Sequence, residues 1–332
     1  MRTKTLLFSS VAIIFLSACG SRQYYTPKQT QSLSPKSGLE VVSLSRDAAM
    51  LEDGTVLSRD GVINLKLGKG YTLIHRGDQA LLIADKRGNI KVIDRAKKSI
   101  DIHLPQALVA GTVIGERLIY LLQDNSFGVY DLNLKKVLYN NKAQKALSID
   151  TRIANPYQID NLVVIPTLNG KLNILDLTSL KVVKELYVST ENTLNNVIFL
   201  GRLDNTLIAA TPYRVISVSS QGQRSFEKAI SEVVIDNQSL FVFAKDGMIS
   251  ELDASMKVLN EKKFKFAHFS IATIKHGKIY AMDKQGYLIV SNRALSKYRV
   301  YELPEIDGYA FVAGEKLYYD GNVVDLSSLS YK

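Results

Sequence analysis

The sequence predicts an all-β protein of the β-propeller class. Three observations lead to this prediction. A unit with several short β-rich runs recurs along the 332 residues, apolar and polar residues alternate within these runs, and the units follow one another every 34 to 44 residues. Alternation with a period of two is typical of strands. A repeat of about 40 residues that holds four strands is typical of a propeller blade.

The clearest unit is "LVVIPTLNGKLNILDLTSLKVVKEL", residues 162–186. It contains an apolar strand, a turn at Asn169-Gly170, an alternating strand that ends in Asp176, a second turn and a third strand. An upstream run, such as "YTLIHRG" at 71–77, supplies a fourth strand. The other copies lie at 79–95, 117–139, 239–264, 278–303 and 316–329, with weaker ones at 48–67 and 205–226. Neighbouring units would bury the two faces of each small sheet.

The number of repeat units follows from their turn positions. They are Gly54, Gly88, Ser126, Gly170, Tyr213, Gly247, Gly286 and Gly321, which predicts eight four-stranded blades. The last unit runs out of chain before its outer strand. Because an open ring leaves unpaired strand edges, we expect the N-terminal segment to close it, through residues 22–28 or a stretch up to Val42. Seven blades with one unit divided differently is the alternative.

The N-terminus predicts export. Arg2 and Lys4 precede an apolar run at 6–16, which ends in Ser17-Ala18-Cys19. This pattern resembles the bacterial lipobox, so we expect a signal peptide at 1–18 and lipidation of Cys19, the only cysteine. Acyl chains such as palmitate would make this protein a stably membrane-anchored lipoprotein. Gly20 in place of an aspartate favours the outer membrane with the protein facing the periplasm; an ordinary signal peptide with a chance cysteine is the alternative.

Composition divides the rest of the chain in two. Residues 19–38 are rich in Ser, Gln, Thr, Lys and Pro and indicate a lipidated cysteine with a flexible tether. Residues 39–332 form one propeller domain, expected to be monomeric. The net charge of +10 falls to +8 without residues 1–18. Basic pairs such as Lys262-Lys263 are interpreted as solvated faces, with steering of an acidic partner or lipid headgroups as the alternative; no nucleic-acid module is recognisable.

The repeat resembles that of the pyrroloquinoline-quinone-like propellers. In residues 162–186 the resemblance rests on Asn169-Gly170, on Leu175-Asp176 and on Thr178-Ser179. The chain has no Trp, so the docking Trp of that repeat is lost and the WD40 signature is absent. Together with the lipobox, the pattern resembles the cofactor-free BamB family of outer-membrane assembly lipoproteins. This resemblance implies a role in outer-membrane protein assembly.

Residues suited to catalysis are scarce. The recurrent acids could suggest a catalytic ring, but each ends the third strand of its unit, where an Asp side chain sets a turn; they are Asp94, Asp131, Asp176, Asp253 and Asp325. His75, His103, His268 and His276 form no metal-binding motif. His268 and His276 flank one strand and could coincide with a site, although core or surface roles are preferred. We therefore predict no catalytic, cofactor-binding or metal-binding residues, and no enzyme.

The preferred function is that of a scaffold or accessory lipoprotein that binds outer-membrane or periplasmic proteins, including a barrel-assembly complex. A surface-exposed adhesin or ligand-binding lipoprotein is the alternative. A quinoprotein enzyme is less favoured. That class needs an aromatic stacking residue, metal ligands and usually longer inserted loops, whereas this chain has no Trp, no adjacent cysteine pair and only short loops.

Two long connections are the candidate partner-binding loops. They span 140–150 and 189–196 at adjacent junctions between units, so they should lie side by side on one rim. The residues singled out in them are Lys142, Lys145, Leu147, Glu191 and Asn192. Drift in loop length is the alternative reading.

Overall fold

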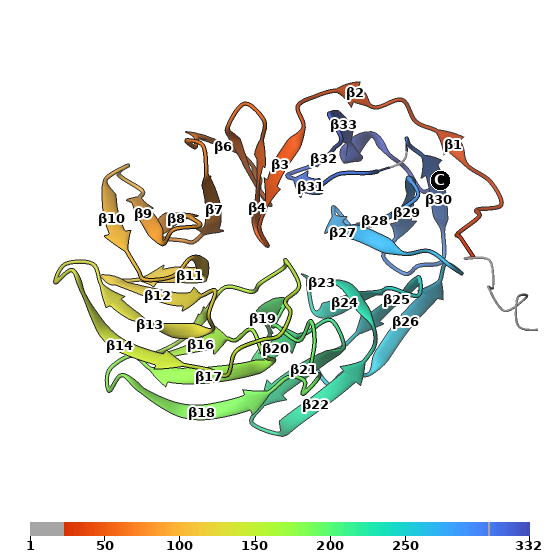
Figure 1. The fold of residues 1–332 in the computed structure, drawn as a ribbon. Helices are drawn as coiled ribbons and strands as arrows, with labels where there is room; N and C mark the ends of the chain where they lie inside the picture. The colour runs from red at the N-terminus through yellow and green to blue at the C-terminus, as the bar shows by residue number, and fades with distance from the viewer. Residues whose placement is uncertain (1–22, 305) are drawn as a thin grey trace, which may run out of the picture.

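The protein is an eight-bladed β-propeller (Figure 1). The computed structural model describes residues 23–304 and 306–332. Each blade is a sheet of four strands, here called A to D, of which A lies nearest the axis and D at the outside. The one described helix is a short 3-10 turn, η1 (Leu326–Ser328). The predicted fold class and the count of eight blades are thus confirmed.

The first four blades follow one another along the chain. Blade 1 contains β3 (Val41–Leu44), β4 (Ala48–Leu51), β5 (Thr55–Ser58) and β6 (Gly61–Lys66). Blade 2 contains β7 (Tyr71–Arg76), β8 (Ala80–Asp85), β9 (Asn89–Asp94) and β10 (Ser99–His103). Blade 3 contains β11 (Leu108–Ile114), β12 (Arg117–Leu122), β13 (Ser126–Asp131) and β14 (Lys136–Lys142). Blade 4 contains β15 (Tyr157–Ile159), β16 (Leu162–Pro166), β17 (Lys171–Asp176) and β18 (Lys181–Tyr187).

The last four blades complete the ring. Blade 5 contains β19 (Phe199–Leu203), β20 (Thr206–Ala210), β21 (Arg214–Ser219) and β22 (Gly222–Glu227). Blade 6 contains β23 (Ile230–Asp236), β24 (Ser239–Ala244), β25 (Met248–Leu252) and β26 (Val258–Lys263). Blade 7 contains β27 (Phe269–Lys275), β28 (Lys278–Asp283), β29 (Tyr287–Asn292) and β30 (Tyr298–Glu302). Blade 8 contains β31 (Ala310–Ala313), β32 (Lys316–Tyr319) and β33 (Asn322–Asp325).

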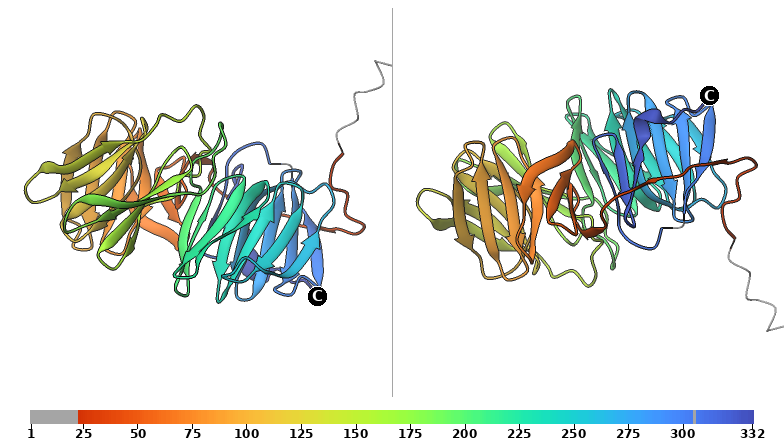
Figure 2. Two further views of the ribbon diagram at one scale, coloured as in Figure 1. Left: turned by 90° about the horizontal axis from the view of Figure 1, so that it is seen from below. Right: turned by 90° about the horizontal axis from the view of Figure 1, so that it is seen from above.

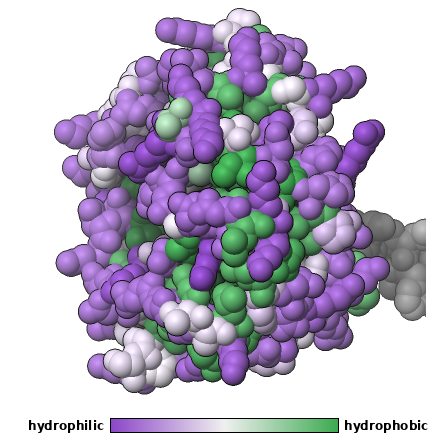
Figure 3. All heavy atoms as spheres, turned by 90° about the vertical axis from the view of Figure 1, so that its left-hand side faces the viewer, coloured by the Kyte–Doolittle hydropathy of each residue, from purple (hydrophilic) through white to green (hydrophobic). Residues whose placement is uncertain are grey.

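Burial changes from the inside of each blade to the outside. Every residue of the B strand β24 is buried, whereas most residues of the D strand β18 are exposed. B strands are covered on both faces by neighbouring blades, so their sequences are continuous apolar runs, whereas D strands face solvent. Figure 3 shows the outer side formed by blades 2 and 3, where hydrophilic side chains project and hydrophobic ones show between them.

The core is divided among the junctions between blades. In the part of the chain that the structure describes, eight clusters of buried apolar residues each span one junction, including that between blades 8 and 1. Five aromatic side chains of this core are almost fully buried: Phe127, Phe241, Phe243, Phe269 and Phe311. The ring is therefore held by many modest apolar interfaces rather than one central core.

The N-terminal segment closes the ring, as predicted. The strand β2 (Lys36–Ser37) pairs antiparallel with β33 and supplies the missing outer strand of blade 8. The strand β1 (Gln31–Ser32) adds to blade 7, parallel to β30. Figures 1 and 2 show this segment running along the outside of blades 7 and 8.

The closing strand lies in one of the two stretches that the sequence predicted. Residues 36–37, in the stretch up to Val42, supply the strand, whereas residues 23–28 form no strand. The span assigned to a flexible tether also contributes Tyr25, β1 and β2 to the fold, so the packed domain begins before residue 39. Composition is a poor guide here, because these residues pack on an existing sheet edge. The predicted signal peptide and Cys19 lie outside the described residues.

The connections define two faces of the disc. Strands in a blade alternate in direction, so A–B and C–D turns lie at one end, and B–C turns and D–A connections lie at the other. We call these the AB face and the DA face. The repeated acids lie at the C–D turns of the AB face, where Asp176 Oδ1 accepts hydrogen bonds from Thr178 N (3.0 Å) and Ser179 N (2.6 Å). Asp94, Asp131, Asp253 and Asp325 accept equivalent backbone bonds, which confirms the turn-setting interpretation.

Candidate functional site

The two long D–A connections lie side by side on the DA face. They span 143–156, between β14 and β15, and 188–198, between β18 and β19; we call them the loop pair. Asn196 joins them: its Oδ1 accepts a hydrogen bond from Asp150 N (2.6 Å), and its Nδ2 donates to Arg152 O (3.0 Å). Leu194 N donates to Ser148 O (3.2 Å). The predicted adjacency of the loops is therefore present in the fold.

A hollow of about 260 Å³ separates the tips of the loop pair. Four of the five candidate residues line it: Lys145, Leu147, Glu191 and Asn192. Leu147 is 82% exposed, the highest value among the exposed large apolar residues of the described chain. Lys142 does not line the hollow; it ends β14, and its Nζ lies 3.0 Å from Asp124 Oδ2. The structure thus gathers four of the five residues and assigns the fifth to an ion pair beside them.

Buried asparagines fix the base of the loop pair. Asn125 is fully buried; its Nδ2 donates to Gln144 O (2.6 Å) and its Oδ1 accepts from Leu168 N (2.9 Å). Asn195 is 3% exposed, and its Nδ2 donates to Ser189 O (3.0 Å). Buried side-chain amides are normally hydrogen-bonded, and the bonds from these two side chains to the loop backbone set the path of the loops. Sequence reasoning missed them; asparagines at turns flanking a long loop were the available signal.

Gly170 and an ion pair hold the loop pair further. Gly170 has a φ of +83°, and a Cβ there would lie 2.4 Å from Asn195 Nδ2. Arg152 Nη2 lies 2.5 Å from Asp150 Oδ2. Burial alone would raise the pKa of Asp150, but the Arg152 guanidinium outweighs it and holds that pKa below its ordinary value. The exposed tips therefore stand on a rigid base.

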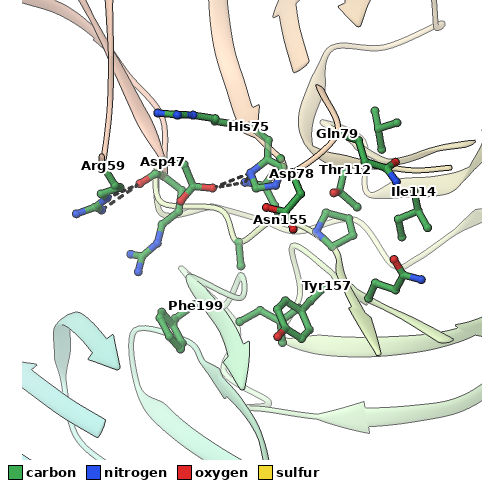
Figure 4. A pocket seen from close by; sticks show the side chains of 18 of the residues that line it. Asp47, Arg59, His75, Asp78, Gln79, Thr112, Ile114, Asn155, Tyr157 and Phe199 are labelled. Atoms are coloured by element: carbon green, nitrogen blue, oxygen red, sulfur yellow. Dashed lines mark hydrogen bonds and ion pairs between the residues drawn. The ribbon is translucent and has the colours of Figure 1, made fainter. Parts of the chain in front are cut away.

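A second, polar pocket opens at the central channel (Figure 4). It measures about 610 Å³. His75 Nδ1 lies 3.0 Å from Asp47 Oδ2, and Asn155 Nδ2 donates to the same oxygen (2.7 Å). Asn155 Oδ1 accepts from Gly111 N (3.0 Å). These groups come from blades 1, 2 and 3 and from the connection before blade 4, and no single repeat predicts their meeting.

The channel also holds a buried carboxylate with arginines around it. Glu232 has a side chain 7% exposed, with Oε1 2.8 Å from Arg46 Nη1 and Oε2 3.8 Å from Arg59 Nη2. Burial would raise the pKa of Glu232, but Arg46, Arg59 and Arg152 lower it below the ordinary value, so the side chain stays charged. Glu232 lies on blade 6 and Arg46 and Arg59 on blade 1, so the pairs connect distant blades across the axis.

The other histidines do not gather into a site. His268 and His276 lie at opposite ends of β27; His276 pairs with Glu315, and the backbone N of His268 donates to Asp283 Oδ2 (2.6 Å). His103 Nδ1 lies 3.1 Å from Asn89 Oδ1. Within residues 23–304 and 306–332, no group of three or more His, Cys, Asp and Glu is placed to hold a metal ion. No helix of this part of the chain is long and apolar enough to cross a bilayer.

Comparisons with known proteins give two kinds of relative. No family model matches the chain. It is 26% identical, over 97% of its own length and about 70% of theirs, to the plasminogen-binding proteins PgbB of Helicobacter pylori strains J99 and 26695. That identity leaves the family open.

Among solved structures, the chain is similar to BamB from Moraxella catarrhalis, with a TM-score of 0.63 and 15% identity over 87% of this chain and 98% of that one. It is also similar to the C-terminal WD40 domain of Sif2, with a TM-score of 0.62 and 12% identity over 89% of this chain and 97% of that one. At such identities the similarity concerns the fold alone. The fold is a BamB-like propeller, as the repeat pattern predicted.

Proposed function

We propose that this protein is a non-enzymatic lipoprotein of the bacterial envelope that is anchored through Cys19 and binds another protein at the loop pair. The observation that supports this most directly is the hollow between the two loops, where the exposed Leu147 stands among Lys145, Glu191 and Asn192 on a rigid base. The proposed location is the outer membrane, with the propeller facing the periplasm.

The loop pair has the physical properties of a binding site for a protein. Burying a leucine side chain under a partner is worth about 1.5–3 kcal/mol. Lys145 and Glu191 carry opposite charges beside it, which favours one orientation of the partner. Because Asn125, Asn195 and Asn196 already hold the backbone, binding costs little loop-ordering entropy. An apolar anchor with a polar surround is the usual arrangement of an interface.

Two partner classes have support. The BamB-like fold supports a partner among outer-membrane or periplasmic proteins, such as a barrel-assembly complex, which is the first candidate. The similarity to proteins named as plasminogen-binding, over 97% of this chain, supports a second candidate, a surface-exposed lipoprotein that binds a soluble protein such as plasminogen. Both candidates use a rigid propeller as a binding surface.

The test compares two matched double variants. The test variant, Lys145→Ser with Leu147→Ser, alters the loop pair. The control, Leu134→Ser with Lys136→Ser, also replaces one leucine and one lysine, but at and beside the C–D turn of blade 3 on the AB face, where Leu134 is 61% exposed. Partners are recovered from membranes by cross-linking and pull-down, and binding of plasminogen to the purified protein is measured separately. We expect the affinity for the partner to fall about tenfold or more in the loop-pair variant alone, and the melting temperature of that variant to stay unchanged.

The result of the pull-down and of the plasminogen assay distinguishes the two candidates. Loss of a membrane-derived partner supports the first candidate, and loss of plasminogen binding supports the second. If the loop-pair variant keeps every interaction of the unaltered protein, the proposed site is wrong.

A further inference from the structure

The N-terminal segment meets the propeller at the junction of blades 6 and 7. Tyr25 is 8% exposed, and its ring makes edge-to-face contacts with Phe264 (centroids 6.2 Å apart) and Tyr287 (5.7 Å). Phe264 begins the D–A connection of this junction. Tyr25 therefore holds the start of the described chain at this junction.

A hollow of about 510 Å³ lies beside that point, on the DA face. Its walls come from the B–C turns of blades 6 and 7, from the D–A connection between them and from residues 23–24. We call the following residues of this hollow the basic patch: Tyr24, Lys245, Lys263, Lys265, Phe266 and Lys284.

The basic patch has an excess of positive charge. Asp246 is occupied by Lys263 (2.6 Å) and Lys228 (3.6 Å). Among the described residues, no carboxylate lies within ion-pair distance of Lys245, Lys265 or Lys284. The other acid of the hollow, Asp283, is 1% exposed. The surface therefore presents lysines whose charge is not neutralised.

Aromatic side chains are exposed beside these lysines. Phe266 is 40% exposed and has a φ of +68°, a backbone conformation that a phenylalanine seldom adopts. Lys265 Nζ lies 4.8 Å from the centre of its ring. Tyr24 is 53% exposed. Lysines beside exposed aromatic rings are the combination that membrane–water interfaces favour: the ammonium groups meet lipid phosphates and the rings enter the headgroup layer.

The length of the chain places this patch near the proposed anchor. Cys19 precedes Tyr25 by six residues, and six residues span at most about 20 Å when fully extended. If Cys19 carries acyl chains in a bilayer, Tyr25 lies within that distance of the lipid surface, and its neighbour Tyr24 belongs to the basic patch. An acidic protein partner could also match the charge, but nothing would then place it beside the anchor.

We infer that the basic patch docks the propeller onto an anionic phospholipid surface, which is the surface of the membrane that holds the acylated Cys19. This inference rests on the proposed membrane anchoring. A lipid on a short tether leaves the orientation of the disc free, whereas contact at the patch turns the DA face toward the bilayer. The loop pair lies on the same face, since it too is made of D–A connections, so its partner is met at the membrane surface.

The test uses the chain from Gly20 onward without lipid, which contains every residue the structure describes. Vesicles of phosphatidylcholine alone are compared with vesicles containing phosphatidylglycerol in sedimentation assays at low and high salt. We expect binding only to the anionic vesicles, weakened by salt. Lys265→Glu with Lys284→Glu should weaken it about tenfold or more. Lys257→Glu with Lys297→Glu, at the C–D turns of the same two blades on the AB face, changes the net charge equally and should retain binding.

A second readout reports orientation. An environment-sensitive dye on Phe266→Cys should shift to the blue with anionic vesicles, and the same dye on Lys297→Cys should not. Absence of binding to anionic vesicles, or equal weakening by both charge variants, overturns the inference. Failure of these assays leaves the loop-pair pull-down unaffected, and an unlipidated Cys19 leaves the vesicle assay unaffected, so the two proposals fail separately.

Discussion

Replacing Tyr25 with alanine tests whether the N-terminal segment is part of the fold. Removal of a buried aromatic ring costs about 3–5 kcal/mol in a fully enclosed core. Tyr25 belongs to a terminal segment that can partly collapse onto the space left by its ring, which lowers this cost. The substitution also removes two edge-to-face contacts, each worth about 0.5–1.5 kcal/mol. We therefore expect a loss of about 3 kcal/mol in the free energy of unfolding, or a melting temperature lower by about 5 °C or more.

The assay combines chemical unfolding with amide hydrogen exchange. Leu33 N donates to Glu302 O (3.0 Å) and Gly38 N donates to Gly321 O (2.8 Å), and both amides should exchange faster in Tyr25→Ala, because the closing segment detaches more often. Tyr309→Ala serves as the control, since Tyr309 is 51% exposed. If Tyr25→Ala melts with this control and exchange at the two amides is unaltered, the segment does not hold the ring.

Three further predictions concern the site, the channel and the anchor. Gly170→Ala should destabilise the protein by about 2 kcal/mol or more and weaken partner binding, because the new Cβ would clash with Asn195. Gly222→Ala is the control: Gly222 also has a positive φ, +109°, but a Cβ there meets nothing within 4 Å, so this variant reports the backbone contribution alone. Equal melting temperatures of the two variants would contradict the clash. Glu232→Gln should cost about 3 kcal/mol at pH 7, because it leaves arginines unpaired. The pKa of Glu232 is lowered in the fold, so its stabilisation is present above the ordinary glutamate pKa of 4.5 and is lost as the pH falls through the folded-state value. The free energy of unfolding should therefore fall less steeply at acidic pH in Glu232→Gln than in the unaltered protein. The same dependence on pH in both proteins would refute this. Cys19→Ala should abolish acylation and release the protein from detergent-phase fractions, and unchanged partitioning with no acyl mass on the native N-terminal peptide would show that Cys19 is not lipidated.

Much of the fold follows from local pattern. Strand alternation, turn glycines and a period of about 40 residues depend on neighbours in the chain, so the blades, their number and the turn role of Asp176 could be predicted from the sequence. The adjacency of the two long loops followed from their adjacent junctions. Ring closure could be predicted because blade 8 ends at β33 without an outer strand, but its location at residues 36–37 could not, since a two-residue edge strand has no pattern of its own.

The contacts across the ring were decided only by the tertiary structure. Asp47, His75 and Asn155 meet in the channel although they belong to three different parts of the repeat series, and Glu232 meets Arg46 from the far side of the axis. Likewise, the packing of Tyr25 at the junction of blades 6 and 7 joins residues more than 200 positions apart. A repeat determines how each blade folds, because its hydrogen bonds are local. Which side chains meet at the axis and at the outer edge depends on the curvature and closure of the whole ring, which no single repeat encodes.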